Sequence, residues 1–252
     1  MLTRVVNWYH MVLNHPGMNR LHETIKAHFY NPQLRNRCEH VAGTCDTCQK
    51  FKLPGRGYGE TPPRQAQIAP WYEVAVDLIG PWKISVPGHD EALVFSALTT
   101  IDTVTNLPEI IRINNKTSQH VAQQFENSWL SRYPRPIHII YDQGSEFKGY
   151  EFQRLIRQYG IRRHPTTVKN PQANAICERL HQTIGNSLRT LLHTNPPQDI
   201  DDANHLMDTA LATAAYAARS ALHHTLKVTP GALVFRRDML LDIPLIADFE
   251  LL

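Results

Sequence analysis

Three acidic residues lie where a carboxylate could bind a metal ion. Asp77 falls inside the apolar run 74–79, and Asp142 directly follows the β-rich run 137–141. Glu178 lies on a long helical pattern. An ionised carboxylate in an apolar strand is costly unless it is paired or bound to a cation. Carboxylate oxygens suit Mg²⁺ or Mn²⁺, and two such ions can clamp both oxygens of a phosphoryl displacement. The trio therefore predicts metal-dependent phosphoryl transfer.

Each acid also has an ordinary structural interpretation. Asp142 followed by Gly144 is typical of a turn. Asp77 could pair with an arginine, and Glu178 could be an exposed helix residue. Only the order, spacing and surroundings of the three acids together favour a metal site.

A second set of residues combines imidazoles and thiols. His10 and His15 are separated by four residues, and Cys45 and Cys48 by two, with 29 residues between the pairs. Two imidazoles and two thiolates make a closed, tetrahedral zinc set. A module of about 50 residues usually needs a metal or disulfides for stability. Pro16-Gly17 predicts that His15 lies just beyond a helix end, where it can turn toward His10.

Either pair alone is weak evidence, because the chain has 14 histidines and Cys-x-x-Cys is also a redox motif. The two pairs together, in one small module, favour structural zinc. The order of the pairs is the reverse of that in a DNA-reading zinc finger, so groove reading is not implied. Less naturally spaced substitutes are His22, His28, Cys38 and His40.

The elements that must position these residues follow from hydrophobic periodicity. Apolar patterns predict strands over 72–79, 92–101, 109–113, 137–141 and 161–164, and helices over 118–133, 152–159, 176–191 and 203–222. Three strands followed by alternating helices and strands indicate an α/β fold with a mixed sheet. Residues 53–70 hold three glycines and four prolines, which is typical of a linker. We therefore expect a zinc-binding domain at 1–52, a linker at 53–70 and a larger domain at 71–252.

Composition excludes several classes of protein. The chain has 252 residues, 42% of them hydrophobic and 19% charged, so it can bury a core. It has no apolar run long enough for a transmembrane span, and its start lacks the features of a secretory signal. Four cysteines are too few for a disulfide scaffold, so we expect a reducing, intracellular location.

The net charge of +3 is unevenly distributed. Residues 148–189 carry eight Lys and Arg against two acids. Such a basic segment suits a polyanion, although solvated helix faces would look the same.

Several motifs, in the same order, resemble the integrases of retroviruses and retrotransposons. Asp77, Asp142 and Glu178, with 35 residues between the last two, resemble the D,D(35)E pattern of that family. Residues 142–147 resemble its D-x-G-x-E-F motif, and 170–179 its H-P-Q-x-x-G-x-x-E-R segment. The upstream His and Cys pairs resemble the HHCC zinc module of Ty3/Gypsy elements, and 229–239 the segment that closes the core. The resemblance spans roughly residues 8–240.

The resemblance implies a ribonuclease-H-like core, a mixed five-stranded sheet flanked by helices, after a small helical zinc-binding domain. It implies a polynucleotidyl transferase that processes the 3′ ends of element DNA and joins them to target DNA with Mg²⁺ or Mn²⁺. It further implies a homo-oligomer that binds DNA and no membrane, in the nucleus or a cytoplasmic particle. The catalytic metal ligands would be Asp77, Asp142 and Glu178, and the zinc ligands His10, His15, Cys45 and Cys48. The phosphate-binding residues would be Lys148, Arg162, Arg163, Lys169 and Arg179.

The sequence also departs from the family pattern. Asn170 stands where histidine is frequent, and Asn174-Ala175 where an aspartate–glycine pair is frequent. Loss of that glycine should stiffen the loop before the catalytic helix. We also expect no SH3-like domain or chromodomain after the core. These departures leave an alternative hypothesis, a catalytically impaired or domesticated nucleic-acid-binding protein derived from an integrase, or a fragment of a polyprotein. A ribonuclease H or transposase that shares the core fits less well, because of the upstream zinc module.

Overall fold

The computed structural model describes most of the chain. The described residues are 1–52, 69–88, 91–165, 177, 180–182, 184–186, 188–190, 192, 196–223 and 225–240. The expected linker therefore lies outside the described residues, except for positions 69 and 70. None of the helices in the described ranges is both long and apolar enough to cross a membrane.

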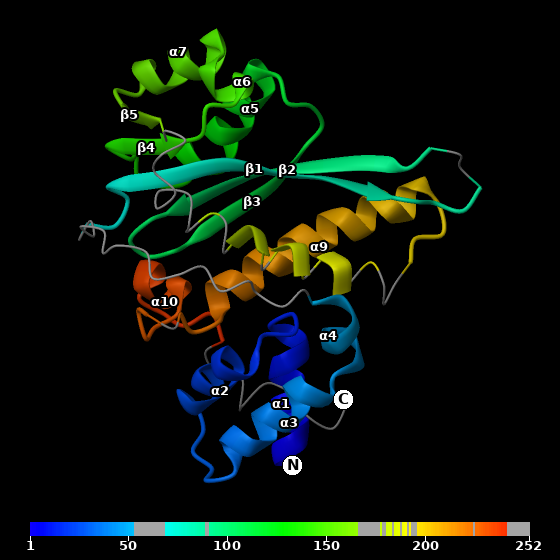
Figure 1. Ribbon diagram of the computed structural model, residues 1–252. Coiled ribbons are helices and arrows are strands. Elements are labelled where there is room, and N and C mark those ends of the chain that lie inside the picture. Colours follow the sequence, from blue (N-terminus) through cyan, green and yellow to red (C-terminus); the bar gives the residue numbers. More distant parts are fainter. Residues whose placement is uncertain are drawn as a thin grey trace.

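A mixed five-stranded sheet forms the centre of the larger part of the molecule (Figure 1). Its strand order is β3-β2-β1-β4-β5. The β1–β2 and β2–β3 pairs are antiparallel, and the β1–β4 and β4–β5 pairs are parallel. The mixed sheet expected from the sequence is confirmed. The strands are β1 (Glu73–Ile84), β2 (Leu93–Asp102), β3 (Pro108–Ile113), β4 (His138–Tyr141) and β5 (Arg162–Pro165).

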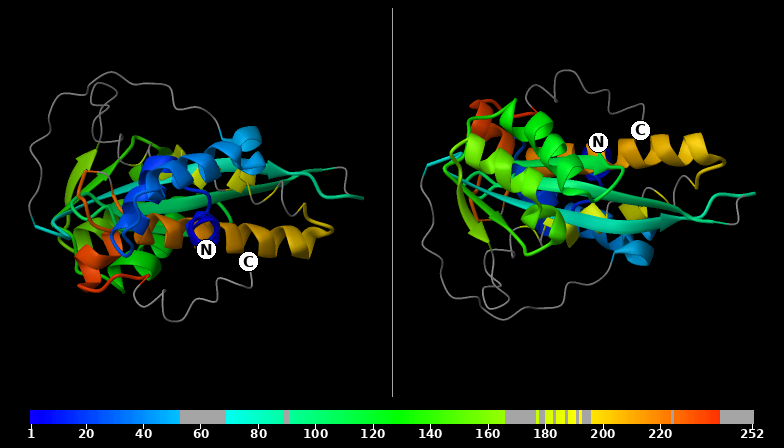
Figure 2. Two further views of the ribbon diagram at one scale, coloured as in Figure 1. Left: turned by 90° about the horizontal axis from the view of Figure 1, so that it is seen from below. Right: turned by 90° about the horizontal axis from the view of Figure 1, so that it is seen from above.

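Helices cover both faces of this sheet (Figures 1 and 2). One face carries α5 (Ser118–Phe125), α6 (Ser145–Lys148) and α7 (Tyr150–Gln158). The other carries α9 (Ile200–Ser220) and the helical residues described between 177 and 192. The single helix expected over 118–133 is wrong in detail, because α5 changes at Glu126 into a π-helical turn, η1 (Glu126–Leu130). The last described helix is α10 (Pro230–Phe235).

The two faces of β1 pack into two different hydrophobic clusters. Val74 and Val76 belong to the cluster with α5 and α7, whose largest member is the fully buried Trp129. Ala75 and Ile79 belong to the cluster with α9 and the helical residues after 177. This alternation follows from the period of two in side-chain direction along a strand. It also assigns Asp77 to the same face as Ala75.

The first 52 residues form a helical module that lies beyond α9, on the side away from the sheet (Figure 1). Its helices are α1 (Leu2–Val12), α2 (Met18–Lys26), α3 (Leu34–Thr44) and α4 (Asp46–Phe51). Residues from outside the module complete its core. Its apolar cluster, which includes Val6, Tyr9 and Leu21, also contains Ala221 and Leu240 from the C-terminal part of the chain.

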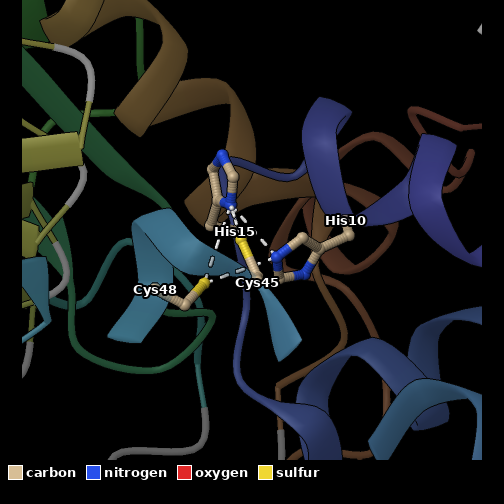
Figure 3. A group of neighbouring side chains, drawn as sticks. All are labelled: His10, His15, Cys45 and Cys48. Atoms are coloured by element: carbon tan, nitrogen blue, oxygen red, sulfur yellow. Dashed lines mark hydrogen bonds between the residues drawn. The ribbon is translucent and has the colours of Figure 1, made fainter. Parts of the chain in front are cut away.

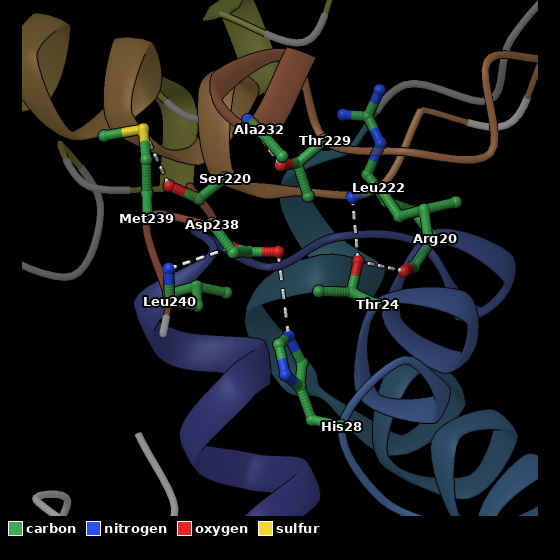
Figure 4. A network of polar contacts seen from close by, with 10 residues as sticks. All are labelled: Arg20, Thr24, His28, Ser220, Leu222, Thr229, Ala232, Asp238, Met239 and Leu240. Atoms are coloured by element: carbon green, nitrogen blue, oxygen red, sulfur yellow. Dashed lines mark hydrogen bonds and ion pairs between the residues drawn. The ribbon is translucent and has the colours of Figure 1, made fainter. Parts of the chain in front are cut away.

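Polar contacts reinforce this junction between the module and the C-terminal segment (Figure 4). The backbone N–H of Leu222 donates to Thr24 Oγ1 at 2.9 Å, and the Thr24 hydroxyl donates to the Arg20 carbonyl at 2.8 Å. His28 Nε2 lies 3.9 Å from Asp238 Oδ2. Arg189 Nε donates to the Phe51 carbonyl at 3.1 Å, which joins the end of α4 to the helical residues between 177 and 192. The four helices are therefore fixed against the larger part of the molecule.

Candidate active site and metal centres

The structure brings the two histidines and two cysteines of the N-terminal module together (Figure 3). One ligand atom from each of His10, His15, Cys45 and Cys48 lies within 4.8 Å of the other three. His15 Nδ1 lies 3.0 Å from His10 Nε2, and the Cys48 Sγ atom lies 3.4 Å from His10 Nε2 and 3.6 Å from His15 Nδ1. Cys45 Sγ lies 3.4 Å from His15 Nδ1.

These distances fit a tetrahedral zinc ion. With Zn–N bonds of about 2.05 Å and Zn–S bonds of about 2.3 Å, tetrahedral geometry puts nitrogens about 3.3 Å apart and nitrogen–sulfur pairs about 3.6 Å apart. The separations of 3.0 Å and of 3.4 to 3.6 Å come close to these values. The donor set and its spacing thus match structural zinc.

The local backbone explains how two histidines five positions apart can converge. The helix α1 ends at Val12, and Asn14 and His15 then have positive φ values of 54° and 56°. This left-handed turn, which asparagine tolerates better than most residues, brings the His15 N–H onto the His10 carbonyl at 2.6 Å. His15 therefore lies beyond the helix end and faces His10, as Pro16-Gly17 predicts.

The pKa shifts in the cluster favour metal binding by the two histidines but disfavour the thiolate form of Cys48. Burial lowers the pKa of His10 to about 3 and also lowers that of His15. Both rings are therefore neutral near pH 7 and have lone pairs to offer. Burial raises the pKa of the Cys48 thiol to about 11. A cation at this point is what would convert the thiol to the thiolate that zinc requires.

The carboxylate pair depends on the parallel pairing of β1 with β4. Ala75 of β1 is the register partner of Ile140 of β4. Asp77 follows Ala75 by two residues within β1, and Asp142 follows Ile140 by two and is the first residue after β4, so the two acids lie toward the same end of this strand pair. Within β1, Asp77 has the side-chain direction of Ala75, whose cluster includes the helical residues after 177.

The third acid, Glu178, lies outside the described residues, as do Lys169 and Arg179. Its described neighbours Cys177 and Leu180 are buried in the cluster that contains Ala75 and Ile140. The described residues thus provide two hard oxygen donors, one within β1 and one directly after the adjacent β4, and such donors are the ligands that Mg²⁺ and Mn²⁺ prefer.

A basic cleft of about 300 Å³ lies beside Asp142. Arg163 Nη1 donates to Gln153 Oε1 at 2.8 Å, which directs this arginine toward α7. Arg162 is not among the lining residues, and its position next to Arg163 on β5 gives its side chain the opposite direction. Of the basic residues singled out from the sequence, the cleft therefore includes Lys148 and Arg163. Its lining residues are Tyr141, Asp142, Gln143, Lys148, Gln153, Arg163 and Pro165.

Two polar residues beside Asp77 were not among the site residues expected from the sequence. His181 Nε2 lies 2.9 Å from Thr99 Oγ1, and His181 Nδ1 lies 3.9 Å from Asp77 Oδ2. Thr99 is the register partner of Asp77 on β2. The signal was present, because residues three apart share a helix face and His181 follows Glu178 by three.

Comparison with known proteins gives a family match in each of the two parts of the chain. Residues 75–171 match the family described as integrase core domain, and residues 1–54 match the integrase zinc binding domain. The polyprotein of transposon Tf2-3 from Schizosaccharomyces pombe is 24% identical over 241 residues, which cover 93% of this chain. The Tf2-4 polyprotein of the same organism matches equally well. The chain spans only 17% of the length of these relatives.

Solved integrase structures share the fold. A chain of the simian T-cell lymphotropic virus intasome, solved in complex with PP2A regulatory subunit B56 gamma, superposes with a TM-score of 0.56. The sequences are 16% identical, over 92% of this chain and 74% of that one. The catalytic core domain of HTLV-2 integrase, solved in complex with magnesium, gives a TM-score of 0.51 at 18% identity, over 66% of this chain and 97% of that one.

Fold and site together define a protein with a His/Cys zinc-binding domain and a ribonuclease-H-like core of the polynucleotidyl transferase superfamily. The matches to the integrase core domain and to the integrase zinc binding domain together cover more than half of the chain. The chain belongs to the integrase family of retrotransposons and retroviruses.

Proposed function

We propose that this chain catalyses metal-dependent 3′-end processing and strand transfer of element DNA into target DNA. The observation that carries the proposal is the parallel pairing of β1 with β4, in which Ala75 and Ile140 are partners and each precedes one of the two acids, Asp77 or Asp142, by two residues. Glu178, three residues before His181 on the same helical pattern, would supply the third carboxylate. A bound Mg²⁺ or Mn²⁺ would lower the pKa of the attacking water or 3′ hydroxyl and stabilise charge on the phosphate.

The residues around Asp142 support a polyanionic substrate. Lys148 and Arg163 line the cleft beside Asp142, where they can contact phosphates without selecting a base sequence. Lys169 and Arg179 would extend this basic surface, and Arg162 would contact phosphate from the other face of β5. DNA ends and target DNA are accordingly the proposed partners. By analogy with its relatives we propose that the chain acts as a homo-oligomer inside the cell, in the nucleus or a cytoplasmic particle.

The substitution Asp142→Asn tests the assignment. The amide oxygen can still accept the Gly144 N–H, which donates to Asp142 Oδ1 at 2.9 Å, so the turn should survive. Removal of the charge should reduce strand transfer at least about a hundredfold, because metal ions supply several kcal/mol of transition-state stabilisation. The measurement is the joining of a labelled duplex with a free 3′ hydroxyl to supercoiled plasmid in Mn²⁺.

Asp201→Asn, at an exposed position in the first turn of α9, is the matched control and should retain full activity. Full strand transfer in Asp142→Asn would refute the assignment. The alternative, an impaired or domesticated nucleic-acid-binding protein, predicts a different result for the wild type. The wild-type protein would then bind DNA, but it would not join DNA and would not bind Mn²⁺ in a calorimetric titration.

A further inference from the structure

His181 is held between two groups at the carboxylate site. Its Nε2 atom lies 2.9 Å from Thr99 Oγ1, and its Nδ1 atom lies 3.9 Å from Asp77 Oδ2. The His181 and Asp77 side chains are only 18% and 14% exposed, and Thr99 is fully buried. The imidazole therefore has a fixed orientation, with one nitrogen toward β2 and the other toward the carboxylate of β1.

The hydrogen bonds of Thr99 determine which nitrogen carries the proton. The Thr99 hydroxyl donates to the Asp77 carbonyl at 3.0 Å. A hydroxyl has one hydrogen to donate, so both contacts of Thr99 are satisfied together when its Oγ1 accepts from His181 Nε2–H. In the neutral ring, Nδ1 then carries a lone pair. The 3.9 Å separation of Nδ1 from Asp77 Oδ2 is too long for a hydrogen bond, so the ring and the carboxylate do not share a proton directly.

Two hydrogen-bond acceptors thus face each other across 3.9 Å. Two acceptors can lie this close when a donor between them gives a hydrogen bond to each. A water molecule about 2.8 Å from each acceptor would span this gap and donate one hydrogen to each. Divalent cations of the Mg²⁺ type keep several of their waters when bound to carboxylates. Residues that hold such outer ligands commonly set metal affinity.

We propose that His181 is a positioning residue of the cation site, and that its Nδ1 and Asp77 Oδ2 together hold one water of the cation's hydration shell. This inference rests on the proposed function, because it assumes a cation at Asp77. Thr99 has a defined part in it: its hydroxyl fixes both the tautomer and the rotation of the ring. His181 itself does not need to change its protonation state.

Two amide substitutions separate the roles of the two ring nitrogens. The amide of His181→Asn places a polar atom where Nδ1 lies, and the longer His181→Gln places one where Nε2 lies. We expect His181→Asn to bind Mn²⁺ within about twofold of the wild type, and His181→Gln to lose about tenfold in affinity, the low end of typical outer-shell effects. The measurement is Mn²⁺ titration of the zinc-loaded full chain by electron paramagnetic resonance, with thermal unfolding as a check on folding.

Equal Mn²⁺ affinity in both variants, whether retained or lost, would overturn the proposal, because the position of the polar atom would then not matter. If His181→Gln does not fold, a comparison of Thr99→Ser with Thr99→Val tests the same proposal. Serine keeps the hydroxyl and should keep the affinity, whereas valine should lose it several-fold; equal affinities would again contradict the proposal. Failure of the proposed function is seen separately, as full activity in Asp142→Asn.

Discussion

The two metal centres differ in what holds their donor atoms together. At the zinc centre the donors come from the end of α1, the turn after it and the start of α4, and no strand pairing joins these segments. At the carboxylate centre Asp77 and Asp142 belong to or follow strands whose backbone pairing is complete without an ion. The comparison indicates that zinc helps to build the fold of its module, whereas the sheet builds the site for the second cation.

Chelation of zinc should give the largest effect. Structural zinc contributes on the order of 10 kcal/mol of apparent folding free energy to small modules near pH 7. The apolar cluster of this module also includes residues from outside it, such as Ala221 and Leu240. We expect a zinc chelator, or Cys48→Ala, to unfold α1 to α4 in the full chain. Circular dichroism and limited proteolysis within residues 1–52 measure this loss.

The matched control for Cys48→Ala is Cys38→Ala. Cys38 is fully buried but is not one of the four clustered donors, so the control should keep one zinc ion and its helices at a cost of about 1 kcal/mol. Helical signal and protease resistance retained in the zinc-free chain would break the comparison, because the module would then fold without its ion.

The contact between the two regions should give the next largest effect. In Thr24→Val the backbone N–H of Leu222 loses its acceptor at a site where Thr24 is 1% exposed. An unpaired buried donor costs about 1–3 kcal/mol. Urea unfolding of the zinc-loaded chain should show this loss in the free energy of unfolding.

Thr44→Val is the matched control for Thr24→Val. The Thr44 hydroxyl donates to the His40 carbonyl at 2.7 Å on an exposed helix end, where water can replace it. Its substitution should change stability by less than about 0.5 kcal/mol. Equal losses in the two variants would mean that the junction does not stabilise the molecule.

Much of the framework could be predicted because it depends on local pattern. The period of two in β1 predicts a strand with two buried faces, and Pro16-Gly17 predicts the end of α1 before His15. The extension of β1 beyond Ile79 could not be predicted, because Gly80-Pro81 resembles a stop. In the structure the pair forms a bulge after which pairing resumes at Trp82. Gly80 is required there: its φ is +104°, and a Cβ atom would lie 2.9 Å from the Phe95 carbonyl oxygen.

The parts that sequence could not provide depend on long-range contacts. The apolar pattern of α1 and α2 does not show whether the core of the module contains its own residues alone or also includes Ala221 and Leu240. The π-helical turn at Glu126–Leu130 also has no signal in the hydrophobic period, since Trp129 is buried in either type of helix. The role of His181 required knowing that Thr99 is the register partner of Asp77.

Removal of Mg²⁺ should give the smallest effect on stability and sharpens the comparison most directly. A ligand that binds only the folded state at about ten times its dissociation constant adds about 1.4 kcal/mol, and the strand pairs that hold Asp77 form without it. We expect the zinc-loaded chain to unfold cooperatively without Mg²⁺, at a slightly lower temperature than with it. Thermal unfolding with and without Mg²⁺ measures the increment, and the same increment should disappear in Asp142→Asn. A zinc-loaded chain whose sheet folds only when Mg²⁺ is added would contradict the view that strand pairing alone builds the carboxylate site.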